Sequence, residues 1–356
     1  MTEQDSVQSS DLIIRRQGRA GRITLNRPKA LNALTHSQTL AIEKALSSWI
    51  DDGDVGLVIL DGAGGKALCA GGDVVSLYKS RADGGDVAAG FWRDEYRLNA
   101  LINRYPKPYV ALMNGIVMGG GIGLAAHGSH RIVTERSMLA MPETMIGLIP
   151  DVGGLWLLAQ CPGHMGEYLG LLGERIGPAD AIYTDIADTF IASDQLDVCV
   201  TALCDPAGNP AGVTIADFAS PPPPPVYAHR QAEINRIFAA PTVEEIASEL
   251  AASSAEWAGH ALHALSIRSP LALKLTLAGI RQARQLSTLE DSLKLEYRMT
   301  TRLYESGEFL EGVRALLVDK DKSPKWTLPT LEAVDDATVE HYLAPLTKRD
   351  ELDLPV

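Results

Sequence analysis

The stretch that decides the fold reads Tyr109-Val-Ala-Leu-Met-Asn-Gly-Ile-Val-Met-Gly-Gly-Gly-Ile-Gly-Leu-Ala-Ala126 and has no formal charge. Its first five residues are a short apolar run typical of a buried strand. A membrane-spanning helix is the alternative, because an uncharged run of about 20 residues can cross a bilayer. The clustered glycines break a helix. They favour a buried strand, a tight turn and a buried helix instead.

A second Gly-rich loop lies earlier in the chain and reads Asp61-Gly-Ala-Gly-Gly-Lys-Ala-Leu-Cys-Ala-Gly-Gly-Asp73. It follows an apolar run at 55–60 that is consistent with a buried parallel strand, and a helix is expected from Asp73. Glycines let the backbone approach a ligand and leave N–H groups pointing outward. Taken alone, this is also the pattern of an ordinary strand–loop–helix connection. Two such loops together predict an oxyanion hole for a carbonyl substrate.

An acid pair follows, in Met141-Pro-Glu-Thr-Met-Ile-Gly-Leu-Ile-Pro-Asp-Val-Gly-Gly154. Glu143 and Asp151 lie there among apolar residues, with no basic residue in the segment. Burial of an ionised acid is costly, so the pKa values of such acids tend to be displaced. Displaced carboxylates suit general acid–base or nucleophilic chemistry. The alternative is a loop whose two acids face water.

The rest of the first half predicts further short strands and helices. Strands are expected at 12–16 and 22–25, and Thr35 and Gln38 form a Thr-x-x-Gln capping box at the start of a helix. A helix over 91–104 carries Glu95 and ends before two prolines. Buried strands alternating with helices predict an α/β fold.

The second half has a different pattern. Residues 207–225 end in five prolines and predict a stiff or disordered connection. A capped helix opens at 241–245, and helical patterns follow at 271–285, 288–305 and 308–318. These features predict three parts, a core over 11–205, a Pro-rich connection over 206–226, and a helical region over 227–356 that packs on the core.

Composition excludes several classes of protein. The 356 residues carry a formal net charge of −13, which argues against a nucleic-acid surface. The four scattered cysteines lack the spacing of a zinc site, so no metal is expected, and they fit a reducing compartment. The N-terminus is polar and lacks an apolar signal core, so a cytoplasmic location is expected. No Gly-x-Ser-x-Gly elbow is present, which disfavours a serine hydrolase.

A nicotinamide enzyme is a competing hypothesis. Gly121-Ile-Gly-Leu-Ala-Ala126 matches a relaxed dinucleotide fingerprint, and Glu143 follows about twenty residues later. The acid lies in a Pro-flanked loop, however, whereas a dinucleotide-binding fold needs it at the end of the next strand.

Four ordered blocks resemble the crotonase (enoyl-CoA hydratase/isomerase) superfamily. They are Asn26-Arg-Pro with Ala30-Leu-Asn-Ala33, Ala67-Leu-Cys-Ala-Gly-Gly-Asp73, Asn114-Gly-Ile-Val-Met-Gly-Gly-Gly121 and Met141-Pro-Glu-Thr144. The resemblance implies a crotonase-like spiral of ββα units, here with a C-terminal helical region, and an acyl-CoA substrate. It also implies oxyanion-hole N–H groups on Gly72 and Gly120, no cofactor beyond the coenzyme A of the substrate, and a homo-oligomer such as a trimer or a dimer of trimers.

The details of the blocks discriminate within that superfamily. A hydratase places one catalytic glutamate at the position of Gly123 and another at that of Glu143, so half of the pair is missing here. Phe91-Trp-Arg-Asp-Glu-Tyr96, Pro150-Asp-Val-Gly-Gly154, Glu311-Gly-Val-Arg-Ala315 and Asp319-Lys-Asp-Lys-Ser-Pro-Lys-Trp326 resemble thioester-hydrolysing members instead. By that resemblance Glu143 and Asp151 are the catalytic acids. The expected substrate-binding residues are Glu95, Ala30, Leu31, Ala70, Gly71 and Asp73.

The expected reaction is hydrolysis of a short branched 3-hydroxyacyl-CoA thioester, which the resemblance places in valine breakdown. Glu143 would either attack the carbonyl or activate water, and Asp151 would orient the substrate hydroxyl or the water, or protonate the departing thiolate. The alternatives are an enoyl-CoA isomerase or hydratase of the same fold and a non-catalytic acyl-CoA-binding protein. No nucleic-acid or membrane partner is expected.

Overall fold

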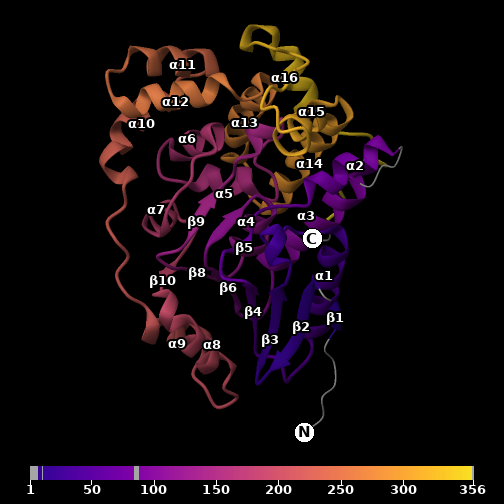
Figure 1. The fold of residues 1–356 in the computed structure, drawn as a ribbon, viewed down its shortest axis with the longest axis vertical. Helices are drawn as coiled ribbons and strands as arrows, with labels where there is room; N and C mark the ends of the chain where they lie inside the picture. The colour runs from indigo at the N-terminus through magenta and orange to yellow at the C-terminus, as the bar shows by residue number, and fades with distance from the viewer. Residues whose placement is uncertain (1–6, 10, 84–87, 355–356) are drawn as a thin grey trace. The chain divides into compact units, whose positions relative to one another are not determined.

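The computed structural model describes residues 7–9, 11–83 and 88–354. Figure 1 labels its helices and strands and colours them in chain order. Contacts between residues divide the chain into two compact units. The first comprises Met1–Gly72, Arg97–Leu139 and Ile176–Val226, and the second comprises Asp73–Tyr96, Ala140–Arg175 and Tyr227–Val356. The units therefore interleave along the sequence. The expected boundaries at 11–205, 206–226 and 227–356 stay a prediction.

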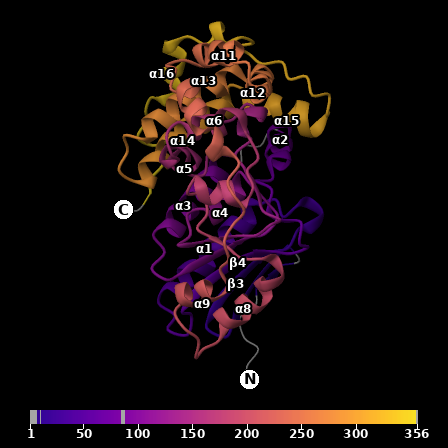
Figure 2. The ribbon, with the colours of Figure 1, turned by 90° about the vertical axis from the view of Figure 1, so that its left-hand side faces the viewer.

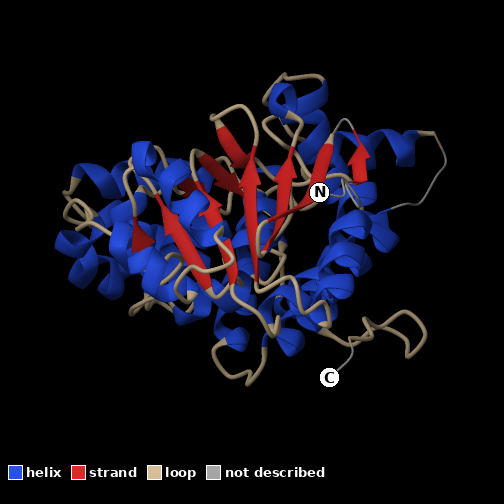
Figure 3. Cartoon of the chain, turned by 90° about the horizontal axis from the view of Figure 1, so that it is seen from below, coloured by secondary structure: helices blue, strands red, loops and turns tan. Residues whose placement is uncertain are grey.

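The first unit is built on a seven-stranded sheet with the order β1-β2-β3-β4-β6-β8-β10. Its strands are β1 Val7–Ser9, β2 Leu12–Gln17, β3 Ala20–Leu25, β4 Leu57–Gly62, β6 Tyr109–Met113, β8 His130–Val133 and β10 Thr189–Phe190. The first two pairs are antiparallel and the four that follow are parallel. The red arrows of Figure 3 show these strands. The expected strand at 109–113 is confirmed, and those at 12–16 and 22–25 are confirmed within two residues.

One face of this sheet is covered by helices α8 (Leu196–Cys204) and α9 (Ala211–Phe218), which lie beside β3 and β4 in Figure 2. Alternate residues of β4, such as Leu57 and Ile59, pack there with Leu203 of α8 and Ile215 of α9. Alternation follows from the period of two along a strand, which sends successive side chains to opposite faces. The predicted connection at 207–225 thus contains α9, and 219–225 follow it without regular structure.

A three-stranded sheet joins the two Gly-rich loops, and its strands are β5 (Ala67–Cys69), β7 (Ile116–Met118) and β9 (Met138–Ala140). Strands β5 and β7 are parallel, with Cys69 opposite Val117. Helix α4 (Gly120–Ala125) follows β7 directly and is entirely buried. The expected strand, Gly turn and buried helix over 109–126 are therefore confirmed. No helix in the described part of the chain is long and apolar enough to cross a bilayer.

Helix α1 (His36–Ile50) begins as the sequence predicts. The Thr35 hydroxyl accepts a hydrogen bond from the Gln38 N–H, and the Gln38 side chain accepts one from the Thr35 N–H. This reciprocal pair satisfies two N–H groups that the first turn of a helix leaves unpaired. The other helical segments of the first unit are η1 Pro28–Ala30, α7 Pro178–Tyr183 and η3 Ser193–Gln195.

The second unit is almost entirely helical. Its first part contains α2 Val74–Ala82, the start of α3 (Ala88–Asn103), η2 Glu143–Ile146, α5 Gly154–Gln160 and α6 Met165–Leu172. Its C-terminal part contains η4 Tyr227–Arg230, α10 Gln231–Phe238, α11 Val243–Ala252, α12 Glu256–Ser266, α13 Pro270–Ala283, α14 Leu289–Glu305, α15 Glu308–Val313, η5 Arg314–Val318, η6 Leu331–Ala333 and α16 Asp336–Leu343.

The long C-terminal helices begin at capping residues. The hydroxyls of Thr242, Ser269 and Thr288 accept a hydrogen bond from the N–H three residues later at the starts of α11, α13 and α14. The helical patterns that the sequence predicts at 241–245, 271–285 and 288–305 correspond to these helices, while the pattern at 308–318 divides into α15 and a π-helical turn. Helices α10, α12 and α16 are not predicted.

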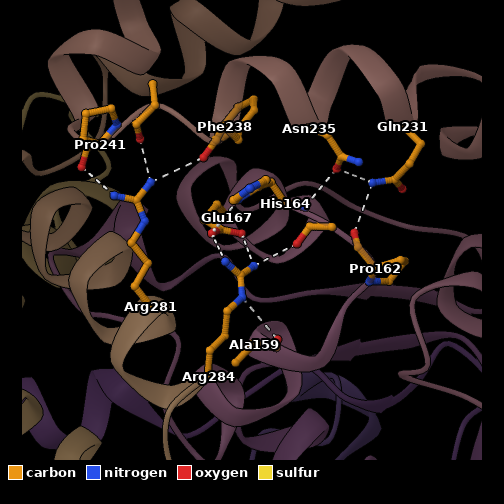
Figure 4. A network of polar contacts seen from close by, with 12 residues as sticks. Ala159, Pro162, His164, Glu167, Gln231, Asn235, Phe238, Pro241, Arg281 and Arg284 are labelled. Atoms are coloured by element: carbon orange, nitrogen blue, oxygen red, sulfur yellow. Dashed lines mark hydrogen bonds and ion pairs between the residues drawn. The ribbon is translucent and has the colours of Figure 1, made fainter.

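A buried ion pair joins α6 to α13 within the second unit (Figure 4). Both oxygens of the fully buried Glu167 accept hydrogen bonds from Arg284, at 2.5 and 2.6 Å, and His164 Nδ1 lies 3.0 Å from Oε1. Arg284 also donates to the carbonyl of Gly163, whose neighbour His164 donates its N–H to Asn235 of α10. A bidentate guanidinium–carboxylate pair of this kind fixes geometry as well as charge. It sets the register of α6, α10 and α13.

Replacing Arg284 with Met should leave the buried Glu167 carboxylate without its guanidinium. We expect the free energy of unfolding to fall by about 3–5 kcal/mol, because an uncompensated buried charge is strongly destabilising. Urea unfolding measures this loss. The matched control is Arg236→Met, which breaks an exposed pair with Glu249 and should cost less than about 1 kcal/mol. Equal losses in the two variants would contradict a structural role for the buried pair.

Candidate active site

Glu143 is the first residue of η2 and lies in the second unit, with 5% of its surface exposed. The turn ends at Gly147, whose φ of 68° is left-handed and suits glycine. A Cβ at Gly147 would lie 2.6 Å from the carbonyl oxygen of Glu308, and one at Gly312 would lie 2.3 Å from the backbone of Ile146. Helix α15 therefore packs against η2 at backbone distance, and its position fixes that of Glu143.

Asp151 precedes a tight turn into α5. Val152 has φ 54° and Gly153 has φ 80°, so two consecutive residues are left-handed. Such a conformation in a β-branched residue is a genuine outlier and costs about 1–3 kcal/mol, which the surrounding structure must offset. The N–H of Gly154 donates to the carbonyl of Asp151 at 2.6 Å and closes the turn. The turn holds the Asp151 carboxyl inside the second unit, with 5% of the residue exposed.

Tyr96 of α3 hydrogen bonds to this carboxyl. Its hydroxyl donates to Asp151 Oδ2 at 2.9 Å and lies 3.5 Å from the hydroxyl of Thr300 on α14. The Tyr96 ring meets the Tyr297 ring edge to face, with centroids 6.2 Å apart. Tyr96 is fully buried, so the packing of α3 on α14 orients its hydroxyl.

Burial dominates the electrostatics of these acids. It raises the pKa of Asp151 to about 7, although the hydrogen bond from Tyr96 acts in the opposite direction. Burial, followed by the charge of Asp151, raises the pKa of Glu143 and of Glu95 well above the usual range for a glutamate. The three carboxyls therefore share one low-dielectric region, in which each favours its protonated form more than an exposed acid does.

Two carboxyl oxygens in this region have no partner. Among the described residues, Oε1 of Glu95 and Oε2 of Glu143 form no hydrogen bond, although both side chains are buried. Nearly all buried polar atoms in proteins are hydrogen-bonded, so an exception calls for an explanation. Atoms of this kind are suited to bind the polar groups of a substrate.

The two Gly-rich loops meet in the first unit. A Cβ at Gly121 would lie 2.3 Å from the carbonyl oxygen of Cys69, and one at Gly71 would lie 3.6 Å from that of Met118. No other described residue accepts a hydrogen bond from the N–H of Gly72 or from that of Gly120, the first residue of α4. The first N–H groups of a helix have no intrahelical partner. Both loops thus present free main-chain donors.

A buried asparagine holds the Gly-rich loop at 61–73 in place. Asn32 donates to the carbonyls of Ala63 and Ala67 and accepts from the N–H of Arg27. Its φ of 57° and that of Leu31, 49°, are left-handed. The Leu31 carbonyl then accepts from the N–H of Ala70 at 3.0 Å.

The structure groups the predicted site residues in two sets. Ala30, Leu31, Ala70, Gly71, Gly72 and Gly120 lie in the first unit, and Asp73, Glu95, Glu143 and Asp151 lie in the second. Glu95, Glu143 and Asp151 come together. Asp73 caps α2, where its carboxylate accepts from the Ser76 N–H at 3.3 Å.

Sequence reasoning missed three polar residues that hold these groups, Asn32, Tyr96 and Glu296. Asn32 and Tyr96 stand inside quoted motifs but received no role. Glu296 had a clear signal, because it lies three residues after Leu293 and seven after Leu289 on the apolar stripe of α14. An acid on such a stripe is buried and must be paired.

The nicotinamide hypothesis finds no support in the local structure. Gly121 and Gly123 of the fingerprint lie inside helix α4 rather than in the loop before it, and Glu143 lies on a 3₁₀ turn rather than at a strand end. The described residues contain no group of three or more His, Cys, Asp or Glu side chains that could hold a metal ion.

Comparison with known proteins gives one consistent family. Residues 20–343 match the enoyl-CoA hydratase/isomerase family. A Xenopus tropicalis protein named mitochondrial 3-hydroxyisobutyryl-CoA hydrolase is 39% identical over 353 residues, which cover 97% of this chain and 91% of that protein.

Two solved structures are similar along their whole length. A carnitinyl-CoA dehydratase from Mycobacterium thermoresistibile and an enoyl-CoA hydratase from Rhodobacter sphaeroides are each 44% identical, with TM-scores of 0.91. The alignments cover 97% of this chain and 99% and 100% of theirs. The chain belongs to the enoyl-CoA hydratase/isomerase family.

Proposed function

We propose that this protein hydrolyses 3-hydroxyisobutyryl-CoA, a short branched 3-hydroxyacyl-CoA thioester, to the free acid and coenzyme A. The observation that carries the proposal is the buried group of Glu95, Glu143 and Asp151, in which two carboxyl oxygens have no partner among the described residues. Such acids can bind a hydroxyacyl group and transfer protons next to it. The similarity to a named hydrolase of this substrate, along nearly the whole of both chains, supports the choice of acyl group.

The proposed oxyanion hole consists of the N–H groups of Gly72 and Gly120. They would receive the thioester oxygen as it gains negative charge, and loss of one such donor typically costs about 3 kcal/mol of transition-state stabilisation. Glu95 is proposed to contact the substrate. The residues proposed to contact it around the thioester are Ala30, Leu31, Ala70, Gly71 and Asp73. Loops that present main-chain donors need no charged side chain to bind the carbonyl.

Glu143 would carry the central step in one of two ways. Its carboxylate attacks the thioester carbon and forms an anhydride that water then cleaves, or it removes a proton from the water that attacks directly. In both routes the C–S bond breaks, water supplies the new C–O bond, and the departing thiolate takes a proton. A pKa of about 7 allows Asp151 to give that proton near neutral pH or to orient the substrate hydroxyl.

Hydration of an enoyl-CoA is the second candidate, because the two solved structures described above carry dehydratase and hydratase names. In the superfamily pattern, a hydratase has a second catalytic glutamate beside the one at position 143, and it would stand at position 123. Here that position is a buried glycine inside α4, which supplies no acid. Thiol release from 3-hydroxyisobutyryl-CoA, measured beside crotonyl-CoA hydration and 3-enoyl-CoA isomerisation, separates the three reactions. Tight acyl-CoA binding without turnover would indicate a non-catalytic protein.

The remaining assignments follow from this chemistry. Hydrolysis needs only water and acids, so we propose that no cofactor takes part beyond the coenzyme A of the substrate. The reaction would serve valine breakdown, and neither nucleic acid nor a membrane is a proposed partner. The four cysteines are buried thiols, which fits the reducing conditions of the predicted cytoplasmic location, although the Xenopus tropicalis relative is named mitochondrial. A homo-oligomer, a trimer or a dimer of trimers, is the proposed assembly, and light scattering would test it.

Replacing Glu143 with Gln should remove the nucleophile or base while keeping the shape of the side chain. We expect kcat for thiol release from 3-hydroxyisobutyryl-CoA to fall about 10²–10⁴-fold, the usual contribution of a positioned acid or base. The matched control is Glu340→Gln, an exposed acid on α16, which should keep the parent rate. A Glu143→Gln rate close to that of the parent would remove Glu143 from the mechanism.

Replacing Tyr96 with Phe tests the role of Asp151. The lost hydrogen bond stabilises the charged form of Asp151, so its removal raises the pKa of Asp151 further above its ordinary value. We expect the limb of the kcat–pH profile that reports Asp151 to move about one unit to higher pH, whether Asp151 acts as acid or base. Tyr105→Phe, which removes a hydroxyl bonded to a backbone carbonyl, is the control and should leave the profile in place. A shift of the Tyr96→Phe limb to lower pH would contradict this assignment.

A further inference from the structure

Glu296 is a fourth buried carboxyl in the second unit, and it differs from the other three in its partners. It lies on α14 and has no exposed surface. Its Oε2 accepts the N–H of Gly153 at 2.7 Å, and its Oε1 accepts the N–H of Leu155 at 3.1 Å and the hydroxyl of Ser292 at 3.1 Å. Both oxygens are therefore occupied by donors, whereas Glu95 and Glu143 each have an oxygen with no partner among the described residues.

These donors belong to the turn that carries Asp151. Gly153 is the N-cap of α5 and has no side chain with which to accept the first N–H groups of the helix. Such groups need an acceptor when they are buried. Glu296 supplies it from a helix about 140 residues later in the chain, at separations of 143 and 141 residues. The C-terminal helical region thus completes the start of α5.

The conformation of this turn requires support from residues outside the turn. Val152 and Gly153 are consecutive left-handed residues, and valine is poorly suited to that region. Strained backbone of this kind persists only where its surroundings over-determine it. Glu296 bonds Gly153 and Leu155, which begin directly after the strained Val152 and two residues after Asp151.

We propose that Glu296 is a positioning residue that fixes the Asp151 carboxyl for catalysis by clamping the turn at 151–155. It acts through the backbone and does not touch the substrate. The proposal rests on the proposed hydrolase function for its kinetic consequence, but the clamp itself is a property of the fold.

The chemistry of the clamp requires a carboxylate. All three partners are donors, so a glutamine at this position would turn its NH₂ group toward the Gly153 N–H on one side, or toward the Leu155 N–H and the Ser292 hydroxyl on the other. The hydrogen bonds on one side of the carboxylate would then be lost, while the volume of the side chain stays almost unchanged. An aspartate would keep the charge but is one methylene too short to reach both amides.

The test combines kinetics with hydrogen exchange on the full chain. For Glu296→Gln we expect kcat for thiol release to fall about 10–100-fold while KM stays within about twofold, because a misplaced catalytic group affects the chemical step more than binding. Amide exchange over 150–157 should become faster. Exchange in α14, which carries Glu296, should stay unchanged. Glu305→Gln, an exposed acid on the same helix, is the matched control and should keep the parent kcat and exchange.

Two results would overturn the proposal. One is parent-like exchange over 150–157 in Glu296→Gln, and the other is an equal effect of Glu305→Gln. If Glu296→Gln does not fold, Glu296→Asp replaces it and should give an intermediate loss of both protection and kcat, and parent values in that variant would equally refute the clamp. A parent protein that releases no thiol from 3-hydroxyisobutyryl-CoA would refute the proposed function alone, since exchange over 150–157 tests the clamp without substrate.

Discussion

The structure of the second unit depends on the burial of four carboxyls away from water. Glu95, Glu143, Asp151 and Glu296 are all buried, and burial raises the pKa of each. A folded-state pKa above the unfolded value means that the folded chain binds protons more tightly. For Asp151 the contribution to stability is therefore greatest below the ordinary carboxyl pKa and is lost as the pH rises through about 7. Acids with raised pKa values are suited to proton transfer near neutral pH, where this stabilisation is lost.

In the proposed mechanism main-chain donors supply the rest of the chemistry, and the close approach of their loops explains why glycine recurs there. The N–H groups of Gly72 and Gly120 donate to no other described residue, and the loops that carry them approach each other at backbone distance. Gly121 makes that approach against Cys69, where any side chain would clash. Asn32 then fixes the loop at 61–73 to the segment at 27–32 by bonding three backbone groups at once. The first unit thus positions main-chain N–H donors with few charged side chains, while the second unit contains the buried acids.

The C-terminal helices are structural partners of the acids within the second unit. Gly312 of α15 lies against the backbone of Ile146, next to the turn that carries Glu143, and Glu296 of α14 clamps the turn that follows Asp151. The turns that carry Glu143 and Asp151 are therefore both held by C-terminal helices of the second unit.

The sequence by itself determined the α/β class, the strand and buried helix over 109–126, the capping box at Thr35 and the presence of an acid pair, because these depend on local periodicity and on residue types. Only the tertiary structure decided which polar groups support the acids. Tyr96 reaches Asp151 across 55 residues and Glu296 reaches Gly153 across 143, and no local pattern records such pairings. The pKa values were likewise decided by packing, because desolvation depends on what surrounds a carboxyl in space rather than on its neighbours in sequence.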